Sequence, residues 1–226
     1  MFGQIRPTPY DVTFSINRIP VRIVPTFWLG AAILNWRELT NAPELMILWI
    51  LCVMVSILLH EMGHALVQQF FGYWPHVVLH HFGGYAAYQP DSRMTWWKSL
   101  LISAAGPGAQ LLLFGLVLLY FNFGMGWKED YRIQAIVEYL YYINLFWPIF
   151  NLVPIYPLDG GRIAEALFQK FTPYNAFRYT RILSIATCVI CLFLTLTYMR
   201  GVMLLPIFFV IFGMQNYQEL TGKRGW

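Results

Sequence analysis

Charge is what this 226-residue chain has least of. Asp, Glu, Lys and Arg supply 12% of the residues, about half the share in a typical soluble domain. A soluble protein needs more charged side chains than this to cover its surface. Hydrophobic residues reach 58%, aromatic residues 18% and the mean hydropathy +0.52. The composition excludes a disordered chain, a basic nucleic-acid-binding domain and an ordinary cytosolic enzyme, and it indicates a polytopic membrane protein.

Cysteine is also scarce. Cys52, Cys188 and Cys191 all lie in apolar runs, so we expect no disulfide framework. Cys188 and Cys191 have no second pair to complete a zinc site, which favours packing inside a helix. We expect no cleavable signal peptide, because the first apolar run begins only near Ile23. Without a repeat or a low-complexity linker, residues 1–226 are predicted to form a single membrane-embedded domain.

Charge-free stretches predict an all-α polytopic protein with six transmembrane helices. A bilayer core about 30 Å thick needs about 20 mostly apolar residues in a helix. The first stretch is short, and the second reaches spanning length only if Glu61 lies inside the membrane. The stretches are Ile23–Trp36, Leu45–Leu59 with its continuation to Trp74, Ser99–Trp127, Tyr139–Leu158, Ile182–Met199 and Gly201–Gln218.

Two segments are predicted to form strands. Residues 75–95 combine Pro and Gly with β-branched and aromatic residues, which is typical of short strands. In the N-terminal segment, Val12, Phe14 and Ile16 alternate with polar residues. We therefore expect a small β-sheet at one membrane face.

The placement of Lys and Arg predicts the orientation of the chain. Cytoplasmic loops carry an excess of these residues, and eleven of the fifteen fall on one side of the six predicted spans. These eleven are Arg6, Arg18, Arg22, Arg93, Lys98, Arg162, Lys170, Arg178, Arg181, Lys223 and Arg224, whereas Arg37, Lys128, Arg132 and Arg200 fall on the other. We therefore expect a multi-pass protein of a prokaryotic cell membrane, with both termini in the cytoplasm.

The second predicted span contains His60-Glu61-Met62-Gly63-His64. On a helix, His60 and His64 share one face and can bind one metal ion, while Glu61 can act as general base on a metal-bound water. With five His and seven Glu in the chain, about 0.003 chance matches to this pattern are expected. A Glu between two His in an apolar span is also costly to bury without a function.

Asp159 is the leading candidate for a third ligand. His60 lies 15 residues beyond Leu45, and Asp159 lies 20 residues beyond Tyr139. These offsets correspond to about 22 and about 30 Å of helix, in spans that run in the same direction. The alternative interpretation of Asp159-Gly160-Gly161-Arg162 is a turn at a helix end. Other acids and histidines are less well placed: Glu138, Glu165, and His76, His80 and His81, for which an interface role is expected.

These motifs resemble the site-2 protease family of intramembrane zinc metalloproteases. The resemblance rests on His60-Glu61-x-x-His64 together with Asn151, Pro154 and the run Pro157-Leu158-Asp159-Gly160. It extends to Arg18–Trp28, to Phe82–Ala86 and to Ser103–Gln110. The family commonly has Asn where Gln110 stands. No PDZ-like or CBS-like domain is expected, so the chain resembles a minimal form of the family.

The resemblance implies a six-span fold with a three-helix catalytic core over residues 45–165, approximately. His60, His64 and Asp159 would bind one zinc ion, Glu61 would be the catalytic base, and Asn151 would position substrate or support an oxyanion. The residues themselves add that Ala104/Gly108 and Ala105/Ala109 are small-xxx-small pairs that allow close helix packing.

The expected activity is hydrolysis of peptide bonds within or near the transmembrane segment of a membrane protein, such as a membrane-anchored regulator. Such a substrate must unwind, and Gly83, Gly84 and Tyr85 are expected to hold it by strand addition. The expected partners are this substrate and the lipid bilayer, with no nucleic acid, and the active site is expected to open toward the cytoplasm. The sequence does not determine an oligomeric state. The alternatives are a metal-ion transporter and a non-proteolytic, metal-bound scaffold.

Overall fold

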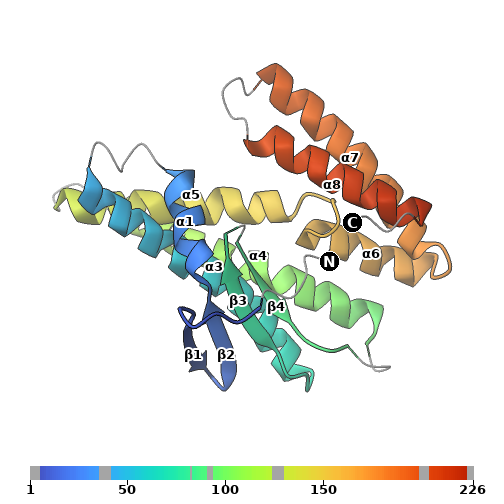
Figure 1. Cartoon of the computed structure of the whole chain (residues 1–226), viewed down its shortest axis with the longest axis horizontal. Helices are drawn as coiled ribbons and strands as arrows, with labels where there is room; N and C mark the ends of the chain where they lie inside the picture. The colour runs from blue at the N-terminus through green and yellow to red at the C-terminus, as the bar shows by residue number, and fades with distance from the viewer. Residues whose placement is uncertain are drawn as a thin grey trace. The chain divides into compact units, whose positions relative to one another are not determined.

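The computed structural model describes residues 6–35, 42–81, 83–90, 94–123, 130–198 and 204–222. The chain forms two compact units, one of residues 1–92 and 105–148 and one of residues 93–104 and 149–226. In the described residues it is mostly helical, with one small sheet (Figure 1). The elements are β1 (Val12–Ile16), β2 (Ile19–Ile23), α1 (Pro25–Leu34), α3 (Pro43–Phe70), β3 (His76–His80), β4 (Gly83–Ala87), α4 (Trp96–Asn122), α5 (Tyr131–Asn151), α6 (Asp159–Phe171), α7 (Ala176–Tyr198) and α8 (Leu204–Thr221).

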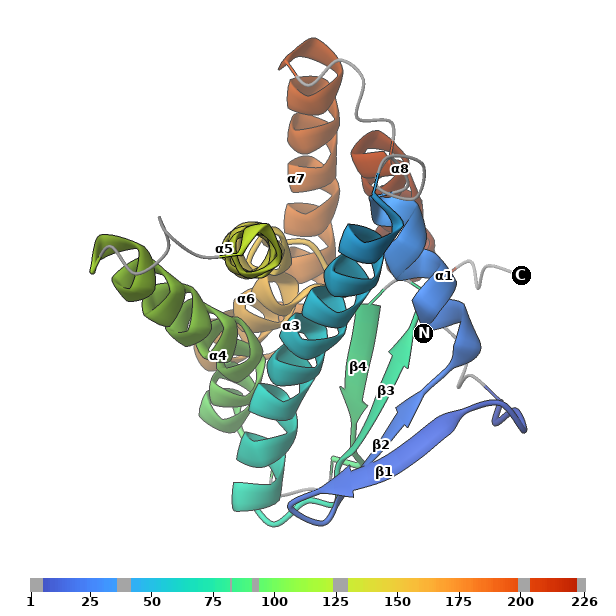
Figure 2. The same ribbon diagram turned by 90° about the vertical axis from the view of Figure 1, so that its left-hand side faces the viewer.

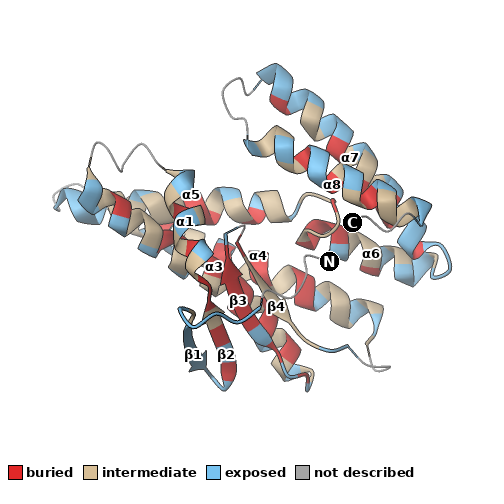
Figure 3. Ribbon diagram, viewed as in Figure 1, coloured by how far each residue is buried: buried red, intermediate tan, exposed pale blue. Residues whose placement is uncertain are grey.

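The two predicted strand segments form one four-stranded sheet in the order β1-β2-β3-β4. β2 and β3 pair in parallel, while the outer pairs are antiparallel. Asn17 and Arg18 both have positive φ and join β1 to β2 in a tight hairpin. β1 is exposed along its whole length, whereas β2 and β3 carry most of the buried apolar residues of the sheet (Figure 3). The expectation of a small sheet is thus confirmed.

The core of the first unit lies between the sheet, α1 and α3. In Figure 2, β3 and β4 run beside α3, and α1 leads from β2 toward the same helix. Phe27 and Ala31 of α1 pack with Val53 and Ile57 of α3 and with Leu79 of β3. The indole of Trp49 also donates to the backbone oxygen of Ala31 at 2.9 Å. These contacts hold α1 and β3 against the central turns of α3.

The second unit is built around the helix pair α7 and α8. Cys188 of α7 packs with Phe209 and Phe212 of α8 and with Ile155, which precedes α6. Cys188 thus packs inside a helix pair, as the sequence predicts. Residues 159–171 follow the fourth predicted span and form α6.

Three of the described helices, α3, α4 and α7, are long and apolar enough to cross a membrane. α1 is apolar but has 10 residues, because Ile23, expected to begin a span, belongs to β2. α5 begins before its predicted start and ends at Asn151, so residues 152–158 do not continue it.

Some of the positive charges used to predict orientation lie in helices instead of loops. Arg178 and Arg181 lie in α7 rather than in a loop, and Arg181 is 4% exposed. Several of the other counted residues lie outside the described part of the chain. These are Arg37, Arg93, Lys128, Arg200, Lys223 and Arg224, together with Phe82 of the predicted strand motif.

Candidate metal centre

His60 and His64 lie one turn apart on α3, and both are buried, with 2% and 6% of their surface exposed. Their Nε2 atoms face each other at 3.2 Å, and their rings are nearly perpendicular. Two nitrogens bound at about 2.0–2.1 Å to one tetrahedral zinc ion lie about 3.3 Å apart. The geometry of the pair therefore fits two ligands of a single metal ion.

The backbone of α4 lies directly against this pair. A Cβ added to Gly106 would lie 2.2 Å from Nε2 of His64, the atom that faces His60. The same Cβ would lie 2.5 and 2.8 Å from the adjacent ring carbons Cε1 and Cδ2, so it would overlap the His64 ring itself. The absence of a side chain at Gly106 therefore lets the ring lie directly against the backbone of α4.

Small residues permit the approach of α4 to α3. A Cβ added to Gly63 would lie 2.5 Å from the backbone oxygen of Ala105 and 3.1 Å from the Cβ of Ala109. The predicted pair Ala105/Ala109 thus lies at a close helix contact. A Cβ at Gly108 would meet nothing within 4 Å, so Gly108 has no such role in the described contacts.

Glu61 is buried between α3 and β4. A Cβ added to Gly84 would lie 2.7 Å from Cγ and 3.0 Å from Oε1 of Glu61, so only glycine lets the strand backbone lie this close to the carboxylate. Two turns further along α3, Gln68 donates from Nε2 to the backbone oxygen of Ala86 at 3.4 Å. The motif helix and β4 therefore run side by side.

β4 is an edge strand, since the described residues pair it with β3 and with no other strand. Gly83 has φ +119°, a conformation that favours glycine, and a Cβ there would lie 2.9 Å from the ring of Trp147. Tyr85 is half-buried, with its ring 5.7 Å from that of His80. The predicted substrate residues thus lie on a strand with one open edge.

A series of buried polar contacts, which begins at Nδ1 of His60, connects α3, α4 and α5. Nδ1 of His60 lies 2.9 Å from Oε1 of Gln110, and Nε2 of Gln110 donates to the backbone oxygen of Ser56 at 3.1 Å. Nδ2 of Asn144 in turn donates to the hydroxyl of Ser56 at 2.9 Å. Gln110, Ser56 and Asn144 are each 0% exposed.

The three remaining histidines lie in or next to β3. His76 and His81 are exposed, as expected for residues at an interface, and Nδ1 of His81 lies 3.3 Å from the hydroxyl of Thr26. His80 differs from the expectation because it is 9% exposed and packed within the sheet. Burial and the neighbouring His81 lower the pKa of His80 to about 4, so His80 is neutral near pH 7.

Asp159 belongs to the second unit, where it is the first residue of α6 and is 8% exposed. Leu158, not Asp159, is the N-cap, and no side chain caps the helix. A Cβ added to Gly160 would lie 2.1 Å from the backbone oxygen of Leu152, and one added to Gly161 would lie 2.3 Å from the backbone nitrogen of Tyr156. The two glycines are therefore required for the first turn of α6 to pack against residues 152–156.

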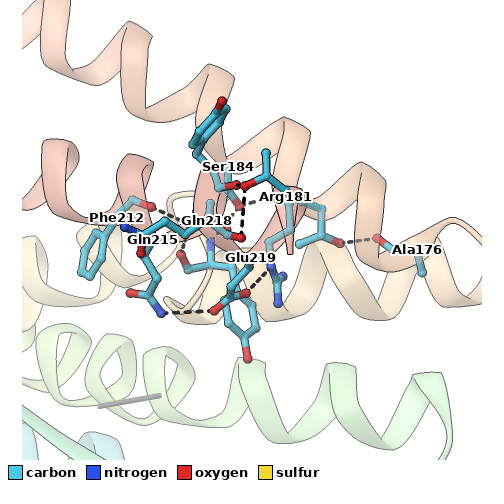
Figure 4. Close-up of polar contacts among 12 residues, drawn as sticks. Ala176, Arg181, Ser184, Phe212, Gln215, Gln218 and Glu219 are labelled. Carbon is cyan, nitrogen blue, oxygen red and sulfur yellow. Dashed lines mark hydrogen bonds and ion pairs between the residues drawn. The ribbon is translucent and has the colours of Figure 1, made fainter. Parts of the chain in front are cut away.

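Side chains of α7 and α8 bond the segment that leads into Asp159. Figure 4 shows Arg181 and Ser184 of α7 and Glu219 of α8 in this group of polar contacts. The backbone nitrogen of Tyr156 donates to Oγ of Ser184 at 2.9 Å, and Nδ2 of Asn216 donates to its backbone oxygen at 2.6 Å. The Arg181 guanidinium lies 3.7 Å from the centre of the Tyr156 ring, and its Nε lies 2.6 Å from Oε2 of Glu219. Both backbone groups of Tyr156 are thus bonded to buried side chains.

Two other residues considered from the sequence lie in these elements. Asn151 is the last residue of α5 and is half-buried. Glu165 lies in α6, where burial raises the pKa of its carboxyl against the opposing effect of Arg181 and Arg162.

Sequence reasoning did not identify Gly106, Ser56 or Asn144, and it left the role of Gln110 open. One signal was available. Gly106 and Gln110 lie four residues apart in an apolar helix and therefore share a face, which in the structure is the face toward His64 and His60.

Residues 123–196 match the family model of peptidase family M50. A protein of Synechocystis sp. with a provisional zinc metalloprotease name is 33% identical over 171 residues, covering 70% of this chain and 44% of that protein. A zinc metalloprotease of Methanocaldococcus jannaschii is 28% identical over 217 residues, covering 92% of this chain and 60% of the relative. The stage IV sporulation protein FB of Bacillus subtilis is 27% identical over 176 residues, covering 76% and 56% respectively.

The solved site-2 protease of Methanocaldococcus jannaschii has the same fold, with a TM-score of 0.65, 24% identity, and coverage of 93% of this chain and 95% of that chain. The resemblance to the site-2 protease family is confirmed. The chain spans about half the length of the curated site-2-type relatives that it matches, from 44% to 60%.

Proposed function

We propose that this chain is an intramembrane zinc metalloprotease. Its substrates would be membrane proteins, cleaved within or near a transmembrane segment. The observation that carries the proposal is the buried pair His60 and His64, whose ring nitrogens face each other at 3.2 Å beside Glu61 on an apolar helix. Membrane spans rarely bury an acid and two histidines unless these groups have a function.

His60, His64 and Asp159 are the proposed ligands of one zinc ion. All three are buried, and each offers one donor atom, a ring nitrogen or a carboxylate oxygen. Two histidines and one carboxylate form a ligand set typical of catalytic zinc, which leaves one position open. The names of the relatives, two of which include the words zinc metalloprotease, also support this choice of metal. When bound, zinc would supply Lewis acidity toward water and the scissile carbonyl.

Glu61 is the proposed general base. Its carboxylate would accept a proton from the attacking water and then pass that proton to the leaving amine nitrogen. Its burial beside Gly84 keeps the carboxylate next to the strand that is the proposed substrate-binding element. A proton acceptor is of use in hydrolysis and has no purpose in a purely structural metal site.

The open edge of β4 is the proposed binding site for an unwound substrate. A substrate strand paired along Gly83, Gly84 and Tyr85 would bring its backbone close to Glu61, because Gly84 lies against that carboxylate. Asn151 would position substrate or support an oxyanion.

The remaining parts of the proposal concern the membrane. Helices α1, α5 and α8 would complete six spans with α3, α4 and α7, and residues 1–226 would form one domain with its catalytic core over about 45–165. Both termini and the opening of the active site would face the cytoplasm of a prokaryotic cell. A single-span membrane protein, such as a membrane-anchored regulator, is the class of substrate.

Glu61→Gln tests the proposed reaction. The amide cannot accept the proton, so we expect cleavage of a co-expressed single-span substrate to fall at least 100-fold, while zinc content stays at the wild-type level. Glu44→Gln, an exposed acid on the same helix, is the matched control and should cleave normally. Cleavage at the wild-type rate by Glu61→Gln would exclude this mechanism.

Tyr85→Pro tests strand addition. Proline removes a backbone donor and disfavours strand pairing, so we expect slower cleavage with unchanged zinc content. Unchanged cleavage would count against the proposed role of β4.

A further inference from the structure

Gln110 is a fully buried amide in the middle of α4, one of the helices suited to cross a membrane. A polar side chain in such a place is costly unless its hydrogen bonds are satisfied. Both ends of this amide have partners. Nε2 bonds the backbone oxygen of Ser56 at 3.1 Å, and Oε1 lies 2.9 Å from Nδ1 of His60.

These two contacts determine which atom donates. A backbone carbonyl only accepts, so the NH₂ group of Gln110 must face Ser56. Oε1 then faces His60, and a carbonyl oxygen also only accepts, so Nδ1 of His60 must carry the proton. In that tautomer Nε2 of His60 carries no proton, and this nitrogen is the one that faces Nε2 of His64.

We propose that Gln110 is a positioning residue for the metal centre, which holds His60 in the tautomer and ring orientation that bind the ion through Nε2. This inference rests on the proposed zinc ligation by His60. Residues that bond the second ring nitrogen of a ligand histidine raise metal affinity about 10- to 100-fold. The hydrogen bond to Ser56 has a separate role, because it determines that the amide oxygen, and not the NH₂ group, faces His60.

Two substitutions separate positioning from mere filling of space. Gln110→Met keeps the approximate volume and removes the acceptor. Gln110→Glu keeps an oxygen that accepts from Nδ1, and a protonated Glu can also donate to Ser56 as the amide does. Gln68→Met is the matched control, because Gln68 is an equally buried glutamine whose amide bonds the backbone of Ala86.

The experiment measures the affinity of the purified full chain for Zn²⁺ by chelator competition, and the visible spectrum of the Co²⁺-loaded protein. We expect Gln110→Met to lose 10- to 100-fold in affinity with an altered Co²⁺ spectrum. Gln110→Glu and Gln68→Met should stay within about threefold of wild type. Thermal unfolding of the metal-free proteins shows whether each variant is folded.

Wild-type affinity in a folded Gln110→Met would overturn the inference, and so would an equal loss in Gln110→Met and Gln110→Glu. If Gln110→Met does not fold, Gln110→Glu decides alone: near wild-type affinity supports positioning, and a tenfold loss overturns it. The proposed proteolysis fails on a different result, namely cleavage by Glu61→Gln, so the two failures are distinguishable.

Discussion

At the scale of single residues, two glycines determine how closely neighbouring elements approach His64 and Glu61. Gly106 and Gly84 each allow a backbone to lie against a side chain of the proposed site, His64 in one case and Glu61 in the other. Neither glycine offers a chemical group. Their contribution is to let α4 and β4 come close enough to form the walls of the site.

Gly106→Ala should therefore weaken metal binding. The new Cβ would lie 2.2 Å from Nε2 of His64, so the ring or α4 must move, and we expect Zn²⁺ affinity to fall by more than tenfold in chelator competition. Gly115→Ala in the same helix is the control, because a Cβ there meets nothing within 4 Å. Alanine at that position should even favour the helix slightly. Normal Zn²⁺ affinity in a folded Gly106→Ala would contradict the proposed ligation by His64.

The same scale shows what the sequence could predict about the site. His60, Glu61 and His64 are adjacent on one helix, so helical spacing alone determines that the two imidazoles share a face. The close approach of Gly106 to His64 and the hydrogen bond of Gln110 to His60 both depend on which face of α4 packs against α3. A single sequence does not contain that information. Gln110 is one carbon longer than the family's Asn, and this extra reach has meaning only across a helix contact.

At the scale of elements, helices α7 and α8 serve a purpose that their composition did not suggest. Their apolar surfaces predicted simple spans, yet Ser184 and Asn216 hold the backbone of Tyr156 three residues before Asp159. Arg181, expected in a loop, completes this contact through the Tyr156 ring and Glu219. The two helices therefore support the segment that presents Asp159.

Asn216→Leu should loosen this segment selectively. The substitution keeps the number of side-chain heavy atoms and their branching, but it removes the amide that bonds the Tyr156 carbonyl, a loss of about 1–3 kcal/mol for a buried group. We expect faster hydrogen exchange in peptides covering residues 152–158. Thr195→Val is the control, because the Thr195 hydroxyl bonds carbonyl groups of its own helix. Equal exchange in Asn216→Leu and wild type would contradict the described support.

The prediction of elements succeeded where the pattern is local and failed where packing decides. Alternation and turn residues predicted the sheet, and long apolar runs predicted α3, α4 and α7. The start of α6 was not predicted because Asp159-Gly160-Gly161 reads as a turn, glycine being a poor helix former. In the structure, those glycines are needed because the first turn of α6 packs directly on residues 152–156.

At the scale of the whole molecule, the proposed ligands are far apart in the sequence, with the histidines in α3 and Asp159 in the first turn of α6. A metal ion that binds the folded chain stabilises it by mass action, by about 2.7 kcal/mol at a hundredfold excess over Kd. An ion bound by all three proposed ligands should stabilise both α3 and the start of α6.

Removal of metal by a chelator should therefore lower the Tm of the purified chain by about 5–10 °C. Hydrogen exchange should rise both around His60 in α3 and at the start of α6. His64→Ala should not respond to the chelator, which controls for nonspecific effects. A change confined to α3 would mean that Asp159 is not a ligand.

The bonds to Tyr156 also bear on hydration. In a bilayer, a polar backbone group that the protein leaves unsatisfied must find water or pay several kcal/mol. Ser184 and Asn216 satisfy both groups of Tyr156, so the irregular segment before Asp159 needs no water molecule there. The proposed hydrolysis requires water at the scissile bond, but the break between α5 and α6 need not open a water-filled path through the membrane.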